Sequence, residues 1–455
     1  MYQAVKTVDK ILRRLFQDAV AMLSVTLSTA ITNSLLRKYY PRGKASSSII
    51  LLEPTQPLST SPVIFSAEFA MVETNVVRVN PEGIKRAAAY ISYKIAAEQY
   101  TPRTWRTQPL HVCPPKPYSP SDPLTRQCLN WIFIISALNF SFWSEREGTA
   151  ERYGVEWRKG WGMEERVVHT GYWSLVAAVN RALEENIPIT DPAFYSSEGL
   201  CPDSLIAYVF RASTQCRESI PLLQERIAIM REVGSILCNN FNGSYLGFLA
   251  SFHNRKYGQG TALDLAEMVT HTFPSFRDEQ WLNGRKVLFW KRAQILVAET
   301  WAAFYPENST YQHPIFPNGP AITTLSMFAD YRVPQILHHL RILEYPDSLA
   351  HKLRAGTYLT SGCREEISLR AASIVAVERV RNEIICLREK SHQGSGEAGC
   401  DDAIGTGQHD EEVSSVLIDF YLWDLAKKIE RGEERIEGVD TADMVPVHRT
   451  RSIWY

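Results

Sequence analysis

The sequence GRKVLFWKRAQILVAETW, at Gly284–Trp301, is followed after a loop by TLSMFADYRVPQIL, at Thr324–Leu337. Apolar residues recur at spacings of three and four through the first stretch, which predicts one helix over its whole length. The second stretch places Asp330 just before another helical run, and Pro334 fits the first turn of that helix, where a missing N–H costs little. Asp330 is therefore predicted at or beside a helix N-terminus, facing the first helix.

The role of Asp330 is open to two interpretations. An Asp in this position most often caps its helix by accepting hydrogen bonds from backbone N–H groups. A carboxylate beside Lys291, Arg292 and Glu299 instead indicates a catalytic or binding site. Arg292 and Glu299 are two turns apart on one stripe of the first helix, so they could also form a simple surface ion pair. The apolar residues around them predict a buried helix, which favours a functional role for Glu299.

Composition limits the class of protein. The chain has 455 residues, of which 45% are hydrophobic and 22% charged, and its formal net charge is −1. This is enough for one large core or two domains, and the near-neutral charge argues against a protein that lives on duplex nucleic acid. The 8 cysteines are scattered without zinc-ligand spacing, which is typical of a reducing compartment such as the cytoplasm. No apolar run reaches membrane-spanning length.

Helical patterns dominate the chain, and strands are few and short. We therefore predict a mostly α fold, a single large helical domain, with a β-hairpin within Glu151–Thr170 followed by a helix at Trp173–Asn186. Residues 1–55 are expected to form a poorly ordered N-terminal extension, although an organelle-targeting segment is the alternative. The proline-rich residues 100–124 are predicted to form an inserted surface loop, and the Gly-rich, acidic residues 390–412 a disordered inserted loop.

Five long segments resemble the queuosine salvage proteins, a family of queuosine 5′-phosphate N-glycosylase/hydrolases. The resemblance extends in order over about residues 60 to 455, so residues 56–455 are expected to form the catalytic domain. It implies hydrolysis of queuosine 5′-monophosphate to release queuine for reuse in tRNA modification, with no metal or organic cofactor. The segments are LNFSFWSE (Leu138–Glu145), HTGYWSLVAAVNRALEENIPIT (His169–Thr190), KRAQILVAETW (Lys291–Trp301), MFADYRVPQIL (Met327–Leu337) and VPVHRTRSIWY (Val445–Tyr455).

This reaction makes specific demands on side chains. Cleavage of an N-glycosidic bond passes through an oxocarbenium-like ribose, which needs a nearby carboxylate, a positioned water or nucleophile, and stabilisation of the departing base. The base is a 7-deazaguanine, so the purine N7 that is often protonated is a carbon here. Asp330 is the candidate for stabilising or attacking the ribose. Glu299 is the second candidate catalytic carboxylate. Members of the family carry Asp at this position, and Glu299 could hold the cationic aminomethyl linker of queuine.

The candidate substrate-binding residues are of three kinds. Aromatic side chains next to polar residues could stack on the base, or could simply belong to the core. Cations could hold the 5′-phosphate, although most arginines are solvated surface residues. A histidine could donate to the substrate, although a lone histidine is more often structural. The predicted residues are Phe142, His169, Tyr172, Trp173, Lys291, Arg292, Phe328, Tyr331, Arg332 and Tyr455, with His448, Arg449 and Arg451 as further phosphate candidates.

Three alternative functions remain open. The protein could be a nucleosidase for another nucleotide, or a non-catalytic protein that binds queuine, which Glu299 in place of Asp favours. A glycosylase acting on nucleic acid is the third. The order helix–loop–Asp–helix distantly resembles helix-hairpin-helix DNA glycosylases, in which Lys291 would lie on the matching side of the site. The charge and the missing Gly-rich hairpin argue against it. The expected partners are therefore small molecules, without direct contact to nucleic acid or membrane.

Overall fold

The computed structural model describes residues 61–307, 312–316, 321–394 and 413–455. These residues belong to one compact unit, Pro57–Tyr455. The predictions for residues 1–55 lie outside the described residues. The same holds for residues 395–412 of the Gly-rich loop, whereas its first residues belong to α14, which ends at Gly394. Within the described ranges, no helix combines the length and the apolar character that crossing a bilayer requires.

Helices make up most of the described chain, which confirms the mostly α prediction, while the similarity to helix-hairpin-helix DNA glycosylases stays a prediction. The helices are α2 (Pro62–Thr74), α3 (Pro81–Ala97), α4 (Pro123–Ala137), α5 (Tyr172–Glu184), α6 (Pro192–Tyr195), α7 (Asp203–Val209), α8 (Leu223–Asn240), α9 (Tyr245–Arg255), α10 (Ala262–Thr272), α11 (Lys291–Ala303), α12 (Val333–His339), α13 (Asp347–Arg354), α14 (Arg364–Gly394) and α15 (Ser415–Glu430), with 3₁₀ turns η1 (Pro102–Thr107), η2 (Pro274–Phe276) and η3 (Ala321–Thr324).

The strands form three small antiparallel pairs. They are β1 (Arg78–Val79) with β6 (Leu343–Glu344), β2 (Gly154–Arg158) with β3 (Arg166–Thr170), and β4 (Glu279–Leu282) with β5 (Arg285–Leu288). The β2–β3 pair is the hairpin predicted within Glu151–Thr170, and the helix predicted after it is α5.

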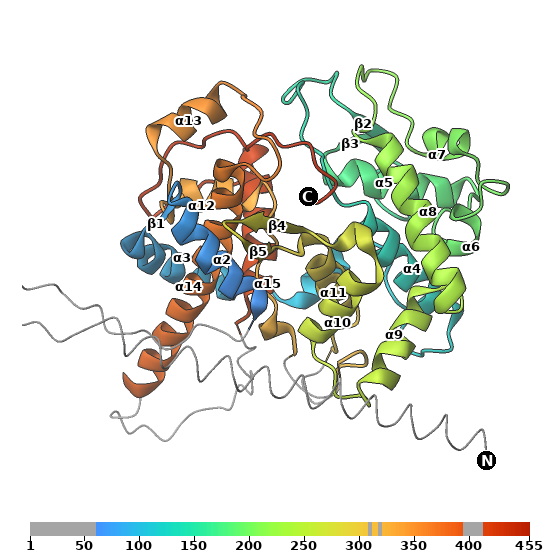
Figure 1. Ribbon diagram of the computed structural model, residues 1–455, viewed down its shortest axis with the longest axis horizontal. Helices are drawn as coiled ribbons and strands as arrows, with labels where there is room; N and C mark the ends of the chain where they lie inside the picture. The colour runs from blue at the N-terminus through green and yellow to red at the C-terminus, as the bar shows by residue number, and fades with distance from the viewer. Residues whose placement is uncertain (1–60, 308–311, 317–320, 395–412) are drawn as a thin grey trace, which may run out of the picture. The chain divides into compact units, whose positions relative to one another are not determined.

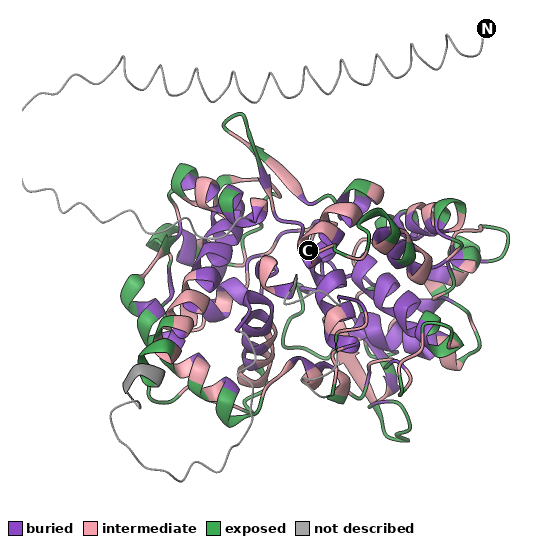
Figure 2. Ribbon diagram, turned by 90° about the horizontal axis from the view of Figure 1, so that it is seen from below, coloured by how far each residue is buried: buried purple, intermediate pink, exposed green. Residues whose placement is uncertain are grey.

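Two groups of helices meet at the centre of the compact unit (Figure 1). In one group α14 packs against α2, α3, α12 and α15. In the other group α4 packs against α5, α8 and α9. Helix α11 lies between the groups and packs against α4, α10 and η1. Buried residues are concentrated inside both groups and where they meet, whereas exposed residues lie on the outer loops (Figure 2). The polypeptide ends between the two groups, so residues distant in sequence converge there.

The helix predicted over Gly284–Trp301 is wrong in its first third. Residues 279–288 form the β4–β5 hairpin, and α11 begins only at Lys291. Asn283 and Gly284 both have positive φ, 48° and 78°, at the turn of this hairpin. An Asn-Gly pair is the strongest short hairpin signal because both residues tolerate that conformation, and it overrides the helical spacing of the apolar residues.

Residues 100–124 are not simply a surface loop. Thr101 caps η1 by accepting a hydrogen bond from the backbone N–H of Arg103, and Trp105 in η1 is only 8% exposed. The guanidinium of Arg106 donates to the carbonyl oxygen of Ala303 at 2.7 Å, which fixes η1 to the C-terminal end of α11. The prolines interrupt the helical pattern, and the segment buries Pro102, Trp105, Leu110 and Pro114 while many of its other residues are exposed. That this segment is an insertion stays a prediction.

Candidate active site

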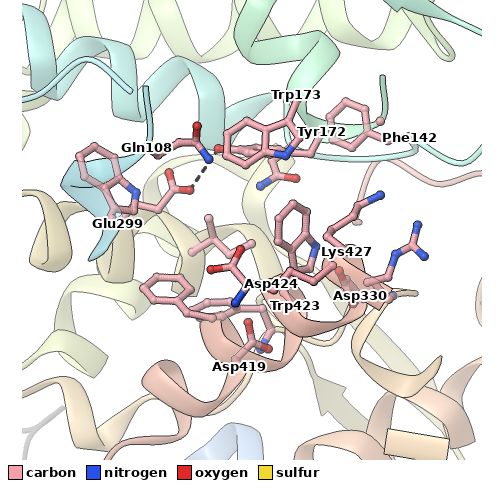
Figure 3. Close-up of a pocket in the computed structure, with 18 of the residues that line it drawn as sticks. Gln108, Phe142, Tyr172, Trp173, Glu299, Asp330, Asp419, Trp423, Asp424 and Lys427 are labelled. Carbon is pink, nitrogen blue, oxygen red and sulfur yellow. Dashed lines mark hydrogen bonds between the residues drawn. The ribbon is translucent and has the colours of Figure 1, made fainter. Parts of the chain in front are cut away.

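A cavity of about 370 Å³ lies where α11, α15 and the start of α5 meet, within the usual range for small-molecule sites. Figure 3 shows residues of α15 on one side of it, with Gln108, Phe142, Tyr172 and Trp173 on the other. Most of the predicted site residues line it, namely Phe142, Tyr172, Trp173, Lys291, Glu299, Phe328, Asp330, Tyr331, Arg332 and Tyr455.

Helix α11 presents one stripe to the cavity. Lys291, Ile295 and Glu299 are four residues apart, so they share a face, and all three line the cavity. With a rise of about 1.5 Å per residue, the two charged ends of this stripe are separated by about 12 Å along the helix axis. That separation is comparable to the length of a nucleoside, so one ligand can contact both ends.

Lys291 is a buried ammonium at the first position of α11. Its Nζ donates to the carbonyl oxygen and to Oδ1 of Asn139, at 3.0 and 3.1 Å, and only 4% of the residue is exposed. Burial lowers the pKa of Lys291 to about 8, while the neighbouring carboxylate of Asp330 acts in the opposite direction. Lys291 is therefore a cation that loses its proton close to physiological pH.

Asp330 both caps a helix and lines the cavity, so the cap does not exclude the functional interpretation. Its Oδ1 accepts hydrogen bonds from the backbone N–H groups of Arg332 and Val333, each at 2.8 Å, which confirms its predicted position at the start of α12. Its Oδ2 accepts none from the described residues. Burial raises the pKa of Asp330, and the charge of Lys291 is the largest opposing effect. Asp330 can thus cap α12 through one oxygen and offer the other to a ligand.

Asp419 on α15 is a second carboxylate beside Asp330. Its Oδ1 accepts from the backbone N–H of Phe328 at 3.0 Å, which ties α15 to the segment that carries Asp330. Burial raises the pKa of Asp419 well above its ordinary value, and the negative charge of Asp330 raises it further. Two carboxylates in one buried site do not both ionise readily. Asp419 is therefore the member of the pair that holds a proton more readily, because Asp330 accepts two backbone N–H groups and lies beside the charge of Lys291.

Glu299 lies at the other end of the α11 stripe. Its two oxygens accept hydrogen bonds from the hydroxyls of Tyr172, at 3.3 Å, and Ser136, at 3.4 Å. Burial raises its pKa to about 7, so Glu299 gains its negative charge only near neutral pH. The predicted alternative, a surface ion pair with Arg292, is wrong because Glu299 is buried and points into the cavity.

Aromatic side chains cover one wall. The ring of Tyr172 lies 6.2 Å from that of Phe142, 4.9 Å from that of Trp173 and 5.9 Å from that of Trp423, as measured between centroids. Such edge-to-face contacts fix the rings in place and leave flat apolar surface toward the cavity. This wall suits a planar heterocycle.

Cations gather at another part of the cavity. Arg332 and Lys427 share one acid, Glu430, at 3.4 and 2.7 Å. Arg152 is paired with Glu147, and all of these residues except Glu430 line the cavity. One carboxylate between two cations leaves an excess of positive charge, which favours an anionic ligand group.

Two of the predicted binding residues do not line the cavity. The guanidinium of Arg292 donates to the carbonyl oxygens of Ala137 and Ser275, so it holds the end of α4. His169 lies on β3, where its Nε2 is 2.8 Å from the carbonyl oxygen of Arg158. In both cases a backbone carbonyl engages the side chain away from the cavity.

The further phosphate candidates do not line the cavity but contact residues that do, Trp143 and Tyr455. Arg451 stacks on the ring of Trp143 with its central carbon 3.4 Å from the centroid, and His448 contacts the hydroxyl of Tyr455 at 3.2 Å. Arg449 lies over the same Trp143 ring at 5.8 Å. Tyr455 itself lines the cavity, while its hydroxyl donates to Glu366 at 2.8 Å.

Sequence reasoning missed the contribution of α15. Asp419, Trp423 and Lys427 are four residues apart and line the cavity, together with Asp424 (Figure 3). Two charged residues eight positions apart, on one face of a largely apolar helix, were a signal for a site. Within the described ranges, no group of three or more His, Cys, Asp or Glu side chains is arranged to hold a metal ion.

A helical unit with a nucleoside-sized cavity, an aromatic wall, a carboxylate beside a lysine and a cationic region defines a protein suited to bind and cleave an anionic heterocyclic small molecule. The family model of the queuosine salvage protein matches residues 118–455, so the chain belongs to the queuosine salvage protein family.

Similar proteins extend this match over most of the chain. A queuosine 5′-phosphate N-glycosylase/hydrolase of Schizosaccharomyces pombe is 37% identical over 403 residues, which cover 87% of this chain and 100% of that protein. The protein of the same name from Mus musculus is 35% identical, with 86% and 97% covered. The one from Sphaerobacter thermophilus is 34% identical, with 81% and 91% covered.

Proposed function

We propose that this protein hydrolyses the N-glycosidic bond of queuosine 5′-monophosphate and thereby releases queuine for salvage into tRNA. The observation that carries the proposal is the buried triad of Asp330, Lys291 and Asp419 at one end of the cavity, with Glu299 at the other. The named relatives support it. We place the reaction in the cytoplasm, which fits the unpaired state of the described cysteines.

Asp330 is proposed to stabilise the cationic ribose. As the bond between C1′ and the base breaks, its electrons leave with the base and positive charge develops at C1′, beside which an ionised carboxylate is most stabilising. Lys291 favours the ionised form of Asp330, whereas Asp419 holds its own proton. A water molecule then gives hydroxide to C1′, and its proton ends on the departing base. Stabilisation of the ribose cation by a fixed negative charge thus compensates for the protonation of N7, which is not possible on a 7-deazaguanine.

The base is proposed to lie on the aromatic wall. Phe142 and Tyr172 offer faces for stacking, and Tyr172 also orients Glu299 through its hydroxyl. Ionised Glu299 would pair with the cationic aminomethyl linker of queuine in a desolvated site, where a charge-assisted hydrogen bond is strong. The separation of about 12 Å along α11 allows Glu299 to bind the linker while Asp330 faces the ribose.

The 5′-phosphate is proposed to bind Arg332 and Lys427. Arg332 follows Asp330 by two residues, so a phosphate close to it is compatible with a ribose at Asp330. Burial lowers the pKa of Lys427, and the positive charge of Arg332 lowers it further, which shows that the two cations repel each other. An incoming dianion would relieve this repulsion.

The direct test is queuine release measured by mass spectrometry with purified full-length protein. Queuosine 5′-monophosphate, queuosine and guanosine 5′-monophosphate would be compared. Release from the first, with a lower kcat/KM for the other two, is expected. Binding of queuosine 5′-monophosphate without release would leave a queuine-binding protein, and faster cleavage of guanosine 5′-monophosphate would indicate a different nucleosidase.

A further inference from the structure

Two buried polar atoms on the cavity wall lack an internal partner. They are Nε1 of Trp105, on η1, and Nε2 of His111, on the loop that follows. Neither atom has a hydrogen-bond partner among the described residues, and both side chains line the cavity. Buried polar groups are nearly always paired, so two unpaired nitrogen atoms on neighbouring side chains of the cavity wall point to a ligand that supplies the partners.

The hydrogen-bonding role of each atom follows from geometry. His111 Nδ1 lies 2.7 Å from the carbonyl oxygen of Trp105, and since a carbonyl only accepts, Nδ1 carries the hydrogen. Burial lowers the pKa of His111 to about 4, so the ring is neutral near pH 7 and Nε2 is an acceptor. The indole Nε1 of Trp105 is always a donor. The two rings are in contact, with centroids 4.1 Å apart and planes tilted by 32°, so donor and acceptor lie on neighbouring rings.

This pair lies at the end of the cavity away from Lys291. Arg106 binds the carbonyl oxygen of Ala303 and so fixes η1 at the C-terminal end of α11, where Glu299 also lies. The ring of Trp173 connects the two regions, because its centroid lies 5.8 Å from that of His111 and 4.9 Å from that of Tyr172. A ligand that extends past Glu299 therefore meets the Trp105–His111 pair.

We propose that Trp105 and His111 bind the hydroxyl groups at the far end of the leaving base and select for them. A hydroxyl both accepts and donates, so it can take a hydrogen bond from Trp105 Nε1 and give one to His111 Nε2. The inference rests on the proposed function. In queuine the group beyond the aminomethyl linker is a cyclopentene ring with two adjacent hydroxyls, which matches a neighbouring donor and acceptor.

The selection is tested with a truncated substrate. kcat/KM is measured for queuosine 5′-monophosphate and for 7-aminomethyl-7-deazaguanosine 5′-monophosphate, which lacks the diol ring. The variants are Trp105→Phe, which keeps an aromatic ring without the N–H, and His111→Asn, which keeps a donor for the Trp105 carbonyl but removes the Nε2 acceptor. Each variant is expected to lower kcat/KM about tenfold for the full substrate and to leave the truncated one unchanged.

Trp131→Phe is the matched control. The ring of Trp131 contacts those of Trp105 and His111, but its Nε1 donates to Asn180 at 2.9 Å and the residue does not line the cavity. This variant is expected to lower the melting temperature without changing the preference between the two substrates. The control therefore separates loss of packing in the aromatic cluster from loss of substrate recognition.

Two results would overturn the proposal while leaving the hydrolase intact. One is an equal loss for both substrates in Trp105→Phe and His111→Asn, and the other is a wild type that cleaves both substrates equally well. If the wild type cleaves neither substrate, the proposed function fails, and calorimetric titration with queuine and 7-aminomethyl-7-deazaguanine decides the inference. A preference for queuine that both variants lose would support the pair, and no preference would refute it.

Discussion

Replacing Asp330 by Asn should remove the charge from the reaction centre and leave the fold unchanged. The amide oxygen of Asn can still accept from the backbone N–H groups of Arg332 and Val333, so α12 should begin as before. Loss of one preorganised electrostatic group typically costs about 2.7–4 kcal/mol. We therefore expect kcat to fall by about 10²–10³-fold, with little change in KM.

The assay is queuine release from queuosine 5′-monophosphate, with the melting temperature measured beside it. Asp330→Ala serves as the control, because it also loses the cap of α12 and should be less stable than Asp330→Asn by about 1 kcal/mol. The negative charge of Asp330 raises the pKa of Lys291, so the remaining activity of Asp330→Asn should fall at a lower pH than in the wild type. A variant Asp330→Asn that keeps kcat within a few-fold of wild type would refute the catalytic role of this carboxylate.

Three further predictions concern pH, stability and specificity. kcat/KM should rise through about pH 7, as Glu299 ionises, and fall above about pH 8, as Lys291 loses its proton. Glu299→Gln should abolish the rise on the acid side of this profile. An unchanged rise in that variant would contradict the assignment of the rise to Glu299. Arg370→Met should lower the free energy of unfolding, measured in urea, by about 3–5 kcal/mol, because it leaves the buried Asp278 carboxylate without its cationic partner. A loss below about 1 kcal/mol would contradict a stabilising ion pair. Lys427→Met should raise KM for the monophosphate and leave that for queuosine unchanged; equal effects would exclude a phosphate contact.

The Arg370 prediction concerns how the site is held together. The guanidinium of Arg370 is fully buried, binds both oxygens of Asp278 and donates to the carbonyl oxygen of Ala329 at 2.9 Å. Asp278 Oδ2 in turn accepts from the backbone N–H of Lys291 at 3.3 Å. This network therefore connects α14 to the residues immediately before Asp330 and at the start of α11, which bear the two opposite charges of the proposed reaction centre.

Local sequence was sufficient for the helices and for the caps. Asn80 stands before Pro81, a pattern typical of a helix start, and its side chain accepts from the backbone N–H groups of Glu82 and Gly83. Asp330 was placed correctly for the same reason, since a cap involves atoms only a few residues apart. The Asn283–Gly284 turn was equally local, and it was missed because the apolar spacing around it happened to fit a helix.

Tertiary structure decided which side chains reach the ligand. Arg292 and Lys291 are adjacent in sequence, yet only Lys291 lines the cavity, because the carbonyl oxygens of Ala137 and Ser275 lie within reach of Arg292. His111 gave no local signal, since its role depends on neighbours far away along the chain, and the four-residue spacing on α15 did not show what Asp419 would face. Periodicity and capping are properties of a few consecutive residues, whereas burial, pKa and unpaired polar atoms depend on contacts that exist only after distant segments have packed together.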